Sequence, residues 1–182
     1  MSRQVDRHVV DPRFVAVHGT DAAEFHAADL ALDRFLDAAT LSAAGALPGP
    51  SAQVRTVLLT GATGFLGRYL VLQWLEQLEL VDGTLVCLVR GKSDADALHR
   101  LEKIFDSGDP RLLAHFRELA AGRLRVVAGD NAQSELGLDG PTWQELAETV
   151  DLIADSAALV NGVLPYSELF GPNVGGTAEL IR

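Results

Sequence analysis

The stretch Gly61-Ala62-Thr63-Gly64-Phe65-Leu66-Gly67 decides the fold of this chain. It follows the apolar, β-branched run 55–60, which predicts a buried strand. Beyond it, bulky apolar residues recur every fourth position and predict one face of an amphipathic helix, at Leu66, Leu70, Trp74 and Leu78. A strand, a glycine-rich turn and a helix in this order are the context that dinucleotide binding requires.

Each glycine of the stretch has a physical role in such a turn. Gly61 permits a tight exit from the strand, Gly64 lets the backbone approach a pyrophosphate, and Gly67 lets the helix lie close to the sheet. The amides at the helix start, aided by the helix dipole, suit phosphate groups. A P-loop is excluded, because Arg68 and Tyr69 stand where it needs Lys and Ser or Thr. A glycine-rich turn without a ligand is the alternative, and we favour a cofactor site.

The composition indicates a soluble globular protein with an acidic balance. Of the 182 residues, 48% are hydrophobic and 22% charged, no apolar run approaches the ~20 residues of a membrane span, and no signal peptide opens the chain. A net charge of −10 argues against nucleic acid as a partner. Cys87 lies in an apolar run and reads as an inert core thiol, while the five histidines show no metal-ligand spacing. We expect a cytoplasmic protein with no membrane, nucleic-acid or metal partner.

Strands and helices alternate beyond residue 50. Strand-like runs are found at 55–60, 84–90, 123–128 and 150–154. Helices are expected after Ser93, with Leu98, Leu101, Ile104 and Phe105 facing inward, from Asp109-Pro110, and from a capping box at Thr142. This order predicts an α/β fold, a Rossmann-like doubly wound parallel sheet of about four strands. A last helix begins near Asn173 and stops at Arg182 without a capping signal, so we expect a fragment with an unfinished sheet.

Residues 1–50 read as a mostly irregular linker before a truncated domain at 51–182. The run 13–19 suggests an extended segment. A short helix is expected near Asp33, with one apolar side made of Leu32, Phe35, Leu36 and Ala39. Pro48-Gly49-Pro50 then breaks the chain before the first strand.

The residue at the end of the second strand predicts the cofactor. NAD-binding folds place an Asp or Glu there, roughly 20 residues past the glycines, to bond the ribose 2′-hydroxyl. Here that place holds Arg90, with Arg100 on the following helix, and guanidinium groups suit a 2′-phosphate. We therefore expect NADPH rather than NADH. Asp130, after the third strand, is equally consistent with an adenine contact and with an ordinary turn aspartate.

Together these residues resemble the thioester-reductase branch of the extended short-chain dehydrogenases/reductases, and more narrowly the reductase domain of carboxylic acid reductases. The resemblance rests on the G-x-x-G-x-x-G spacing at 61–67 and on further segments spread along nearly the whole chain, namely 32–35, 51–55, 89–90, 105–110, 129–130, 136–138, 155–161 and 163–177. It implies an adenylation domain and a phosphopantetheine carrier domain upstream in the same polypeptide. It also implies that hydride from NADPH reduces the carrier-bound acyl thioester to an aldehyde.

The resemblance further implies which residues hold NADPH. They are Gly61, Thr63, Gly64, Phe65, Leu66, Gly67, Arg90, Arg100, Asp130, Asn131, Ser156, Ala157 and Ala158. Two of them depart from the family's pattern, because Asn131 replaces a more usual lysine and Ser156 a usual proline. Asn173 resembles the asparagine that supports the family's catalytic lysine through water.

The family's proton donor, a tyrosine in Tyr-x-x-x-Lys, is not found in these 182 residues. Tyr69 and Tyr166 are followed four positions later by Gln73 and Phe170. We therefore expect the chain by itself to be inactive. One alternative is a nucleotide-sugar epimerase or dehydratase of the same superfamily, against which Arg90 and the linker argue. Another is a non-catalytic NADP-sensing protein, which would keep the glycine turn without the tyrosine.

Overall fold

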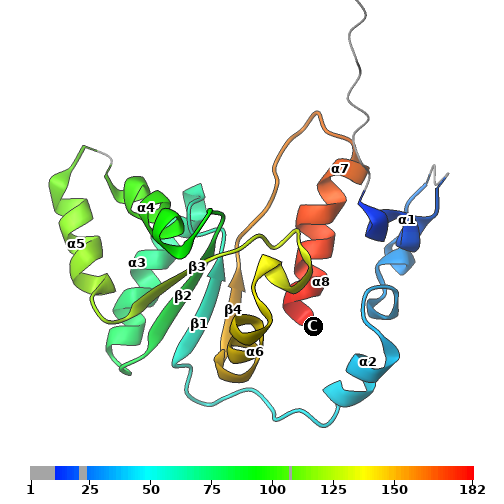
Figure 1. The fold of residues 1–182 in the computed structure, drawn as a ribbon, viewed down its shortest axis with the longest axis horizontal. Coiled ribbons are helices and arrows are strands. Elements are labelled where there is room, and N and C mark those ends of the chain that lie inside the picture. The colour runs from blue at the N-terminus through cyan, green and yellow to red at the C-terminus, as the bar shows by residue number, and fades with distance from the viewer. Residues whose placement is uncertain (1–10, 21–23, 107) are drawn as a thin grey trace, which may run out of the picture. The chain divides into compact units, whose positions relative to one another are not determined.

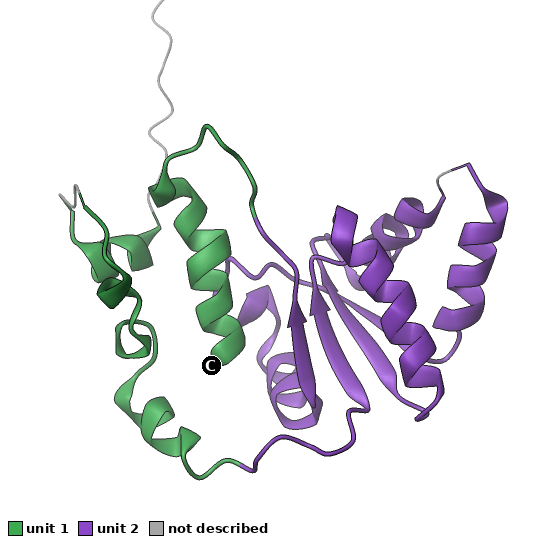
Figure 2. Cartoon of the chain, turned by 180° about the vertical axis from the view of Figure 1, so that it is seen from behind, with its two compact units in different colours: residues 1–47, 159–182 green, residues 48–158 purple. Residues whose placement is uncertain are grey.

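The structure, a computed structural model, describes residues 11–20, 24–106 and 108–182 (Figure 1). The chain divides into two compact units (Figure 2). Unit 1 comprises residues 1–47 and 159–182, and unit 2 comprises residues 48–158. Residues 1–10 and 21–23 of the expected linker lie outside the described residues.

Unit 2 is built on a parallel sheet. Its strands are β1 (Thr56–Thr60), β2 (Thr84–Val89), β3 (Leu124–Ala128) and β4 (Leu152–Asp155), in the order β3-β2-β1-β4. The predicted Rossmann-like sheet is thereby confirmed, with the fourth strand starting at Leu152 rather than Val150. Because the chain returns from β3 to the far side of β1, the strand order reverses between β1 and β4. Doubly wound folds bind ligands at the carboxyl ends of such strands.

The helices of unit 2 cover the two faces of this sheet. They are α3 (Phe65–Glu79), α4 (Asp94–Phe105), α5 (Pro110–Ala120) and α6 (Gly140–Thr149), with a 3-10 turn at Ser134–Gly137. Figure 1 shows α3, α4 and α5 on one face and α6 on the other. The expected start of α6 at Thr142 is wrong, because the Asp139 carboxylate accepts a hydrogen bond from the Thr142 amide (2.8 Å) and begins the helix at Gly140.

The predicted inward faces of two helices need correction. In α3 the fully buried positions are Gly67, Val71, Leu75 and Leu78, whereas Leu66 is 58% exposed. The helix meets the turn after β1 through Gly67, so its buried face is turned by one residue from the row of bulky side chains. In α4, Leu98 is 40% exposed and Ala97 is buried. The reason is the same, because a small residue makes the close contact. Leu101 and Phe105 are buried as expected.

Unit 1 contains more helix than the sequence analysis predicted. Its elements are α1 (Pro12–His18), 3-10 turns at Ala27–Leu30 and Leu32–Arg34, α2 (Ala38–Ala44), and a helical run made of α7 (Tyr166–Phe170), a π-helical turn (Gly171–Gly175) and α8 (Gly176–Ile181). The extended segment predicted at 13–19 is wrong. Asp11 caps α1 by accepting from the Arg13 amide (2.8 Å), and Pro12 occupies its first position.

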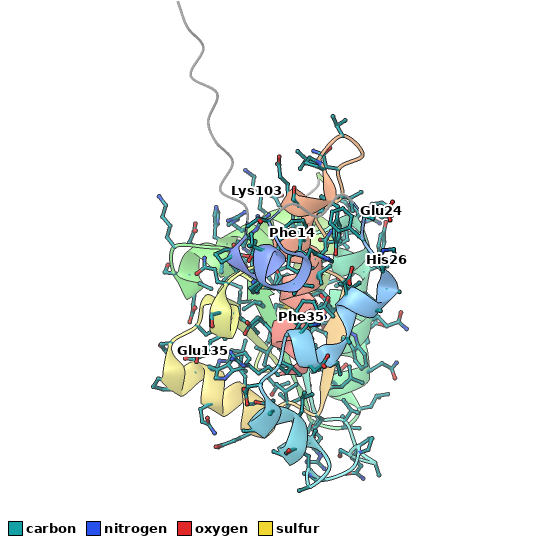
Figure 3. The ribbon with its side chains drawn as sticks, turned by 90° about the vertical axis from the view of Figure 1, so that its right-hand side faces the viewer. Phe14, Glu24, His26, Phe35, Lys103 and Glu135 are labelled. Carbon is teal, nitrogen blue, oxygen red and sulfur yellow. The ribbon has the colours of Figure 1, made fainter. Side chains whose placement is uncertain are left out.

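The core of unit 1 is aromatic. Phe14, Val17 and Phe170 are buried together, and Phe35 packs against them (Figure 3). Phe14 and Phe170 meet edge to face with ring centroids 5.4 Å apart. The helix expected near Asp33 is a 3-10 turn that leaves Leu32 exposed, with Ala39 likewise exposed in α2. The last helical run starts at Tyr166 rather than Asn173.

The structure bears on two predictions from the sequence, that no segment spans a membrane and that Cys87 lies in the core. Within residues 11–20, 24–106 and 108–182, no helix combines the length and apolar character that a membrane span needs. Cys87 lies fully buried in β2, as predicted for a core residue, and burial raises the pKa of its thiol. A thiol held neutral in the core is chemically inert.

Asp151 ties the beginning of β1 to the beginning of β4. Its carboxylate accepts hydrogen bonds from the amides of Arg55 (2.8 Å) and Thr56 (2.9 Å). These two backbone bonds hold the pKa of Asp151 below its ordinary value. A carboxyl whose pKa is lowered by folding stabilises the fold above its unfolded pKa, and that stabilisation is lost as pH falls through the folded pKa.

We therefore predict that Asp151→Asn lowers the urea midpoint at pH 7. The difference in midpoint from wild type should narrow as the pH falls below about 4, the ordinary aspartate pKa, and on through the lowered pKa of the folded carboxyl. Urea unfolding of both proteins at pH 7 and pH 3 measures this. An equal gap at both values would show that the carboxylate's charge contributes nothing.

Candidate functional site

The turn between β1 and α3 leaves no room for a side chain at its first glycine. Gly61 has a φ of +69°, in the left-handed region. A Cβ on Gly61 would lie 2.6 Å from the Ser156 carbonyl and from the Ala157 amide nitrogen. The turn therefore passes directly against the backbone that follows β4. This brings two of the predicted cofactor segments, 61–67 and 156–158, into contact.

The third glycine brings α3 onto the turn itself. A Cβ on Gly67 would lie 2.0 Å from the Gly61 carbonyl oxygen, so any larger residue would push the helix away. The Gly64 amide closes the turn by donating to the Gly61 carbonyl oxygen (2.9 Å). No side chain caps α3 and no acidic residue occupies its first turn. Its first amides are therefore available to an anion. We call these amides, together with the turn at 61–64, the cradle, and its geometry fits the pyrophosphate of a dinucleotide.

Thr60 joins the ends of β1 and β4 from beneath the turn. Its side chain is buried, and its hydroxyl donates to the Asp155 carboxylate. The same hydroxyl oxygen accepts from the Ala157 amide (3.2 Å), and the Ser156 hydroxyl donates to the Thr60 carbonyl oxygen (2.8 Å). The sequence analysis missed Thr60 and Asp155 as supports of the site. The available signal was a polar residue at the end of each central strand, buried in the case of Thr60 and exposed in the case of Asp155.

Arg90 and Arg100 are brought together where β2 ends. Arg90 is exposed directly after the strand, and Arg100 reaches back from α4 so that its Nη1 donates to the Arg90 carbonyl oxygen (2.5 Å). Within the described residues, neither guanidinium forms an ion pair with a carboxylate. Both positive charges are therefore available to a ligand at this strand end.

Asp130 is held in a compact turn after β3. Its amide donates to the Leu136 carbonyl oxygen (2.7 Å), and its carboxylate accepts from the Ala132 amide (3.0 Å). Glu135 and Leu136 adopt positive φ angles of 52° and 57°, which folds the loop back onto the strand end. Asp130 and Asn131 are both half-buried. Because the carboxylate accepts a hydrogen bond within the turn, the structure supports the role of a turn aspartate. The contact with adenine stays a prediction.

The strand order places four of the predicted segments along one edge. Parallel strands end at the same side of a sheet, and the order β3-β2-β1-β4 arranges Asp130, Arg90, Gly61 and Ser156 in that sequence across it. A crevice at this edge, beside the point where the strand order reverses, is where doubly wound folds bind dinucleotides. The residues present thus fit a nicotinamide dinucleotide.

Asn173 belongs to unit 1 and is fully engaged with the backbone there. Its Oδ1 accepts from the Leu159 amide (2.7 Å) and its Nδ2 donates to the Leu159 carbonyl oxygen (3.1 Å). It lies in the π-helical turn, a feature often found at functional sites. The structure therefore gives Asn173 the role of holding the loop at Leu159, and the catalytic support stays a prediction.

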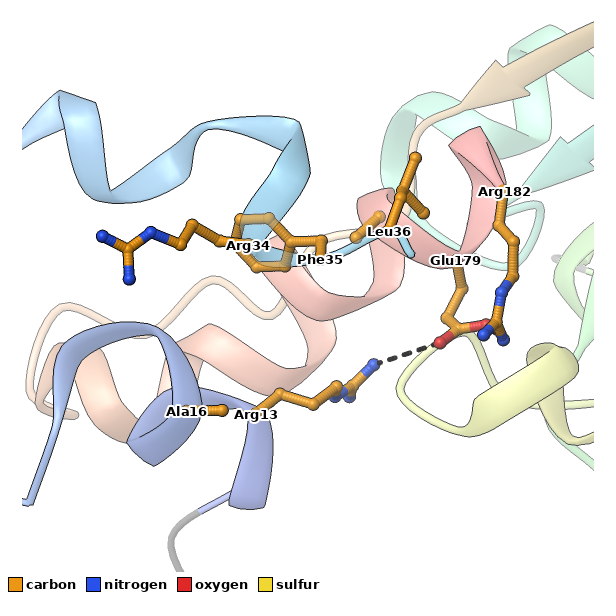
Figure 4. A pocket seen from close by; sticks show the side chains of 8 residues that line it. Arg13, Ala16, Arg34, Phe35, Leu36, Glu179 and Arg182 are labelled. Carbon is orange, nitrogen blue, oxygen red and sulfur yellow. Dashed lines mark ion pairs between the residues drawn. The ribbon is translucent and has the colours of Figure 1, made fainter. Parts of the chain in front are cut away.

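A pocket of about 70 Å³ in unit 1 is a weaker candidate (Figure 4). Arg13 and Arg182 approach the Glu179 carboxylate at 3.8 Å and 3.5 Å, and Asp11 grips the Arg13 guanidinium. The hydrogen bonds that the Arg13 guanidinium donates to the Asp11 carboxylate raise the pKa of Arg13. The Arg34 guanidinium points away from this pair in Figure 4. Asp11 and Glu179 pair with Arg13 and Arg182, whereas Arg34 lines the pocket outside this group, and we assign no binding site to the pocket.

Comparison with known proteins shows the family. Residues 59–182 match the NAD-binding family described as male sterility protein. The chain belongs to this family. Every predicted cofactor residue and Asn173 fall within the range that the NAD-binding family covers.

The relatives of this chain include reductases and synthases. It is 67% identical to carboxylic acid reductase of Mycobacterium tuberculosis over 171 residues, which cover 94% of the chain and 15% of that protein. It is 68% identical to isonitrile lipopeptide synthase of the same organism over 176 residues, 97% of the chain and 7% of that protein. The crystal structure of the reductase domain of a non-ribosomal peptide synthetase from M. tuberculosis superposes with a TM-score of 0.80 at 70% identity, covering 87% of the chain and 36% of that domain. The chain thus spans only a small part of these two curated relatives and about a third of the solved reductase domain.

We predict that Gly67→Ala disrupts the cradle. The new methyl group meets backbone rather than a flexible side chain, so α3 must shift, at a cost of about 1–3 kcal/mol in unfolding free energy. Dinucleotide affinity should fall with it. Gly140→Ala is the matched control, because a Cβ there meets nothing within 4 Å. Urea unfolding and fluorescence titration with NADPH measure both effects, and equal behaviour of the two variants would contradict the close contact.

Proposed function

We propose that this chain is the NADPH-binding part of a thioester reductase domain of the carboxylic acid reductase type. The observation that carries the proposal is the glycine turn beneath α3, which opens at the switch point of a parallel sheet. Relatives named as reductases, at 67% identity and above, support the reaction class. The chain spans 15% and 7% of the curated relatives, so the activity of the whole protein is part of the proposal.

In this proposal the residues of the chain bind and orient the cofactor. The first amides of α3 hold the pyrophosphate, Asp130 with Asn131 contacts the adenine, and the small residues 156–158 lie beneath a ribose. When bound, NADPH supplies the hydride. Thr60, through Asp155 and the Ala157 amide, fixes the two strand ends between which the dinucleotide would lie.

The proposed substrate is an acyl thioester on the phosphopantetheine arm of a carrier domain. Hydride adds to the thioester carbonyl carbon and a proton to its oxygen, giving a thiohemiacetal. Cleavage of the carbon–sulfur bond then releases an aldehyde and the free thiol. The carrier domain and an adenylation domain would lie upstream in the same polypeptide. Much longer relatives support that arrangement.

Arg90 and Arg100 select NADPH over NADH in this proposal. We predict that Arg90→Ala in the full-length protein weakens NADPH about ten- to a hundredfold, the value of a charge-assisted phosphate contact, and changes NADH little. Fluorescence titration with both cofactors measures the ratio. Arg111→Ala is the control, since the Arg111 side chain is 90% exposed in an ion pair with Asp109. Equal losses for both cofactors would show that Arg90 does not read the phosphate.

The reductase activity is tested directly with a simple thioester. Full-length protein, NADPH and benzoyl-coenzyme A should give loss of nicotinamide absorbance together with benzaldehyde. Free benzoate without ATP should give neither, because a carboxylate lacks the thiol leaving group. Binding of NADPH without its consumption would favour the NADP-sensing alternative. An epimerase or dehydratase would likewise show no net oxidation of the cofactor.

A further inference from the structure

Arg68 stands at an electrostatically unfavourable place. It directly follows Gly67, and its amide makes the first helical hydrogen bond of α3, to the Gly64 carbonyl oxygen (3.2 Å). The amino end of a helix carries partial positive charge and disfavours a cation. The first turn of α3 offers no acidic residue to offset that effect. An arginine here is therefore stabilised by something other than the helix.

The side chain of Arg68 lies back over the first turn instead of leaving it. Helical side chains lean towards the amino end, and the Arg68 Cζ lies 4.9 Å from the ring centroid of Phe65, the first residue of α3. The Arg68 guanidinium also contacts Tyr69. Its Cζ lies 4.8 Å from the Tyr69 ring centroid, and its Nη2 donates to the Tyr69 hydroxyl (3.0 Å). The two rings are 78% and 53% exposed, so they hold the guanidinium at the surface of this turn.

The hydrogen bonding of this guanidinium is incomplete. Arg68 Nε is buried and has no hydrogen-bond partner among the residues that the structure describes. Other arginines of the described residues, such as Arg117 and Arg125, form ion pairs with Glu102 and Glu145. Arg68 forms none there, and its described contacts are the two aromatic rings and a phenol. The rings cover the flat faces of the guanidinium, and no carboxylate of the described residues serves as its counter-ion.

We propose that the counter-ion of Arg68 is the pyrophosphate of the bound dinucleotide, with Phe65 and Tyr69 as positioning residues for the guanidinium. The inference rests on the proposed function, because it needs a dinucleotide in the cradle. It explains why a cation is placed at the positive end of α3 in a chain of net charge −10. The pyrophosphate is common to both nicotinamide cofactors, so Arg68 acts on NADPH and NADH alike, unlike Arg90.

The test compares Arg68→Gln with Arg68→Lys in the full-length protein. We expect Arg68→Gln to weaken NADPH and NADH by a similar factor, about tenfold or more, as for a lost charge-assisted hydrogen bond. Its thermal midpoint without cofactor should be unchanged or higher, because a cation has left the positive end of α3. Arg68→Lys keeps the charge and should retain most of the affinity. Fluorescence titration and thermal melting supply the two readouts.

The opposite signs of the two readouts separate this proposal from a purely structural role. A lower midpoint without cofactor, with or without weaker binding, would show that the cation–π contacts serve folding and would overturn the inference. A loss of affinity for NADPH but not for NADH would show that Arg68 contacts the 2′-phosphate, and would also overturn the inference. If Arg68→Gln binds both dinucleotides as tightly as the wild type does, the inference about Arg68 is overturned and the proposed function stands. A wild-type protein that binds neither dinucleotide overturns the proposed function and this inference with it.

Discussion

The contact between Gly67 and the Gly61 carbonyl oxygen determines the geometry of the cofactor edge. A single methyl group at position 67 would lie 2.0 Å from that oxygen, so α3 can cross the turn only where no side chain exists. This crossing sets the rotation of α3, with Val71, Leu75 and Leu78 against the sheet. It also directs the first amides of α3 towards the turn. The helix phase, the core of unit 2 and the phosphate cradle therefore have one common origin.

The parts of the fold that local sequence controls were predictable. Buried β-branched runs predicted all the strands of unit 2, and a parallel sheet then brings Arg90 and Asp130 to the same edge as the glycine turn. The rotation of α3 was not predictable from periodicity. Bulky residues every fourth position suggested one face, while the closest contact belongs to the residue without a side chain. The extended segment expected in unit 1 failed because Asp11 and Pro12, a capping pair, outweigh the β-branched residues that follow.

The polar supports of the site lay beyond local sequence reasoning for a different reason. Thr60 meets Asp155 and Ala157 across a separation of 95 and 97 residues, and their link exists only because β1 and β4 are neighbours. Asn173 likewise mimics a strand partner for Leu159 by using both ends of its amide. Each of these side chains bonds to backbone near a strand end, where the sheet ladder stops and its last groups need partners.

The chain is acidic, yet its proposed ligand is an anion. A net charge of −10 repels a dinucleotide at long range, yet that repulsion is screened beyond about 8–10 Å at physiological ionic strength. Backbone amides at a helix start carry no net charge, so they bind phosphate without altering the field of the whole molecule. Arginines then need to act only at contact distance. Affinity for the dinucleotide thus depends on the close backbone packing that the glycines permit and on a few placed cations, rather than on the overall electrostatic balance.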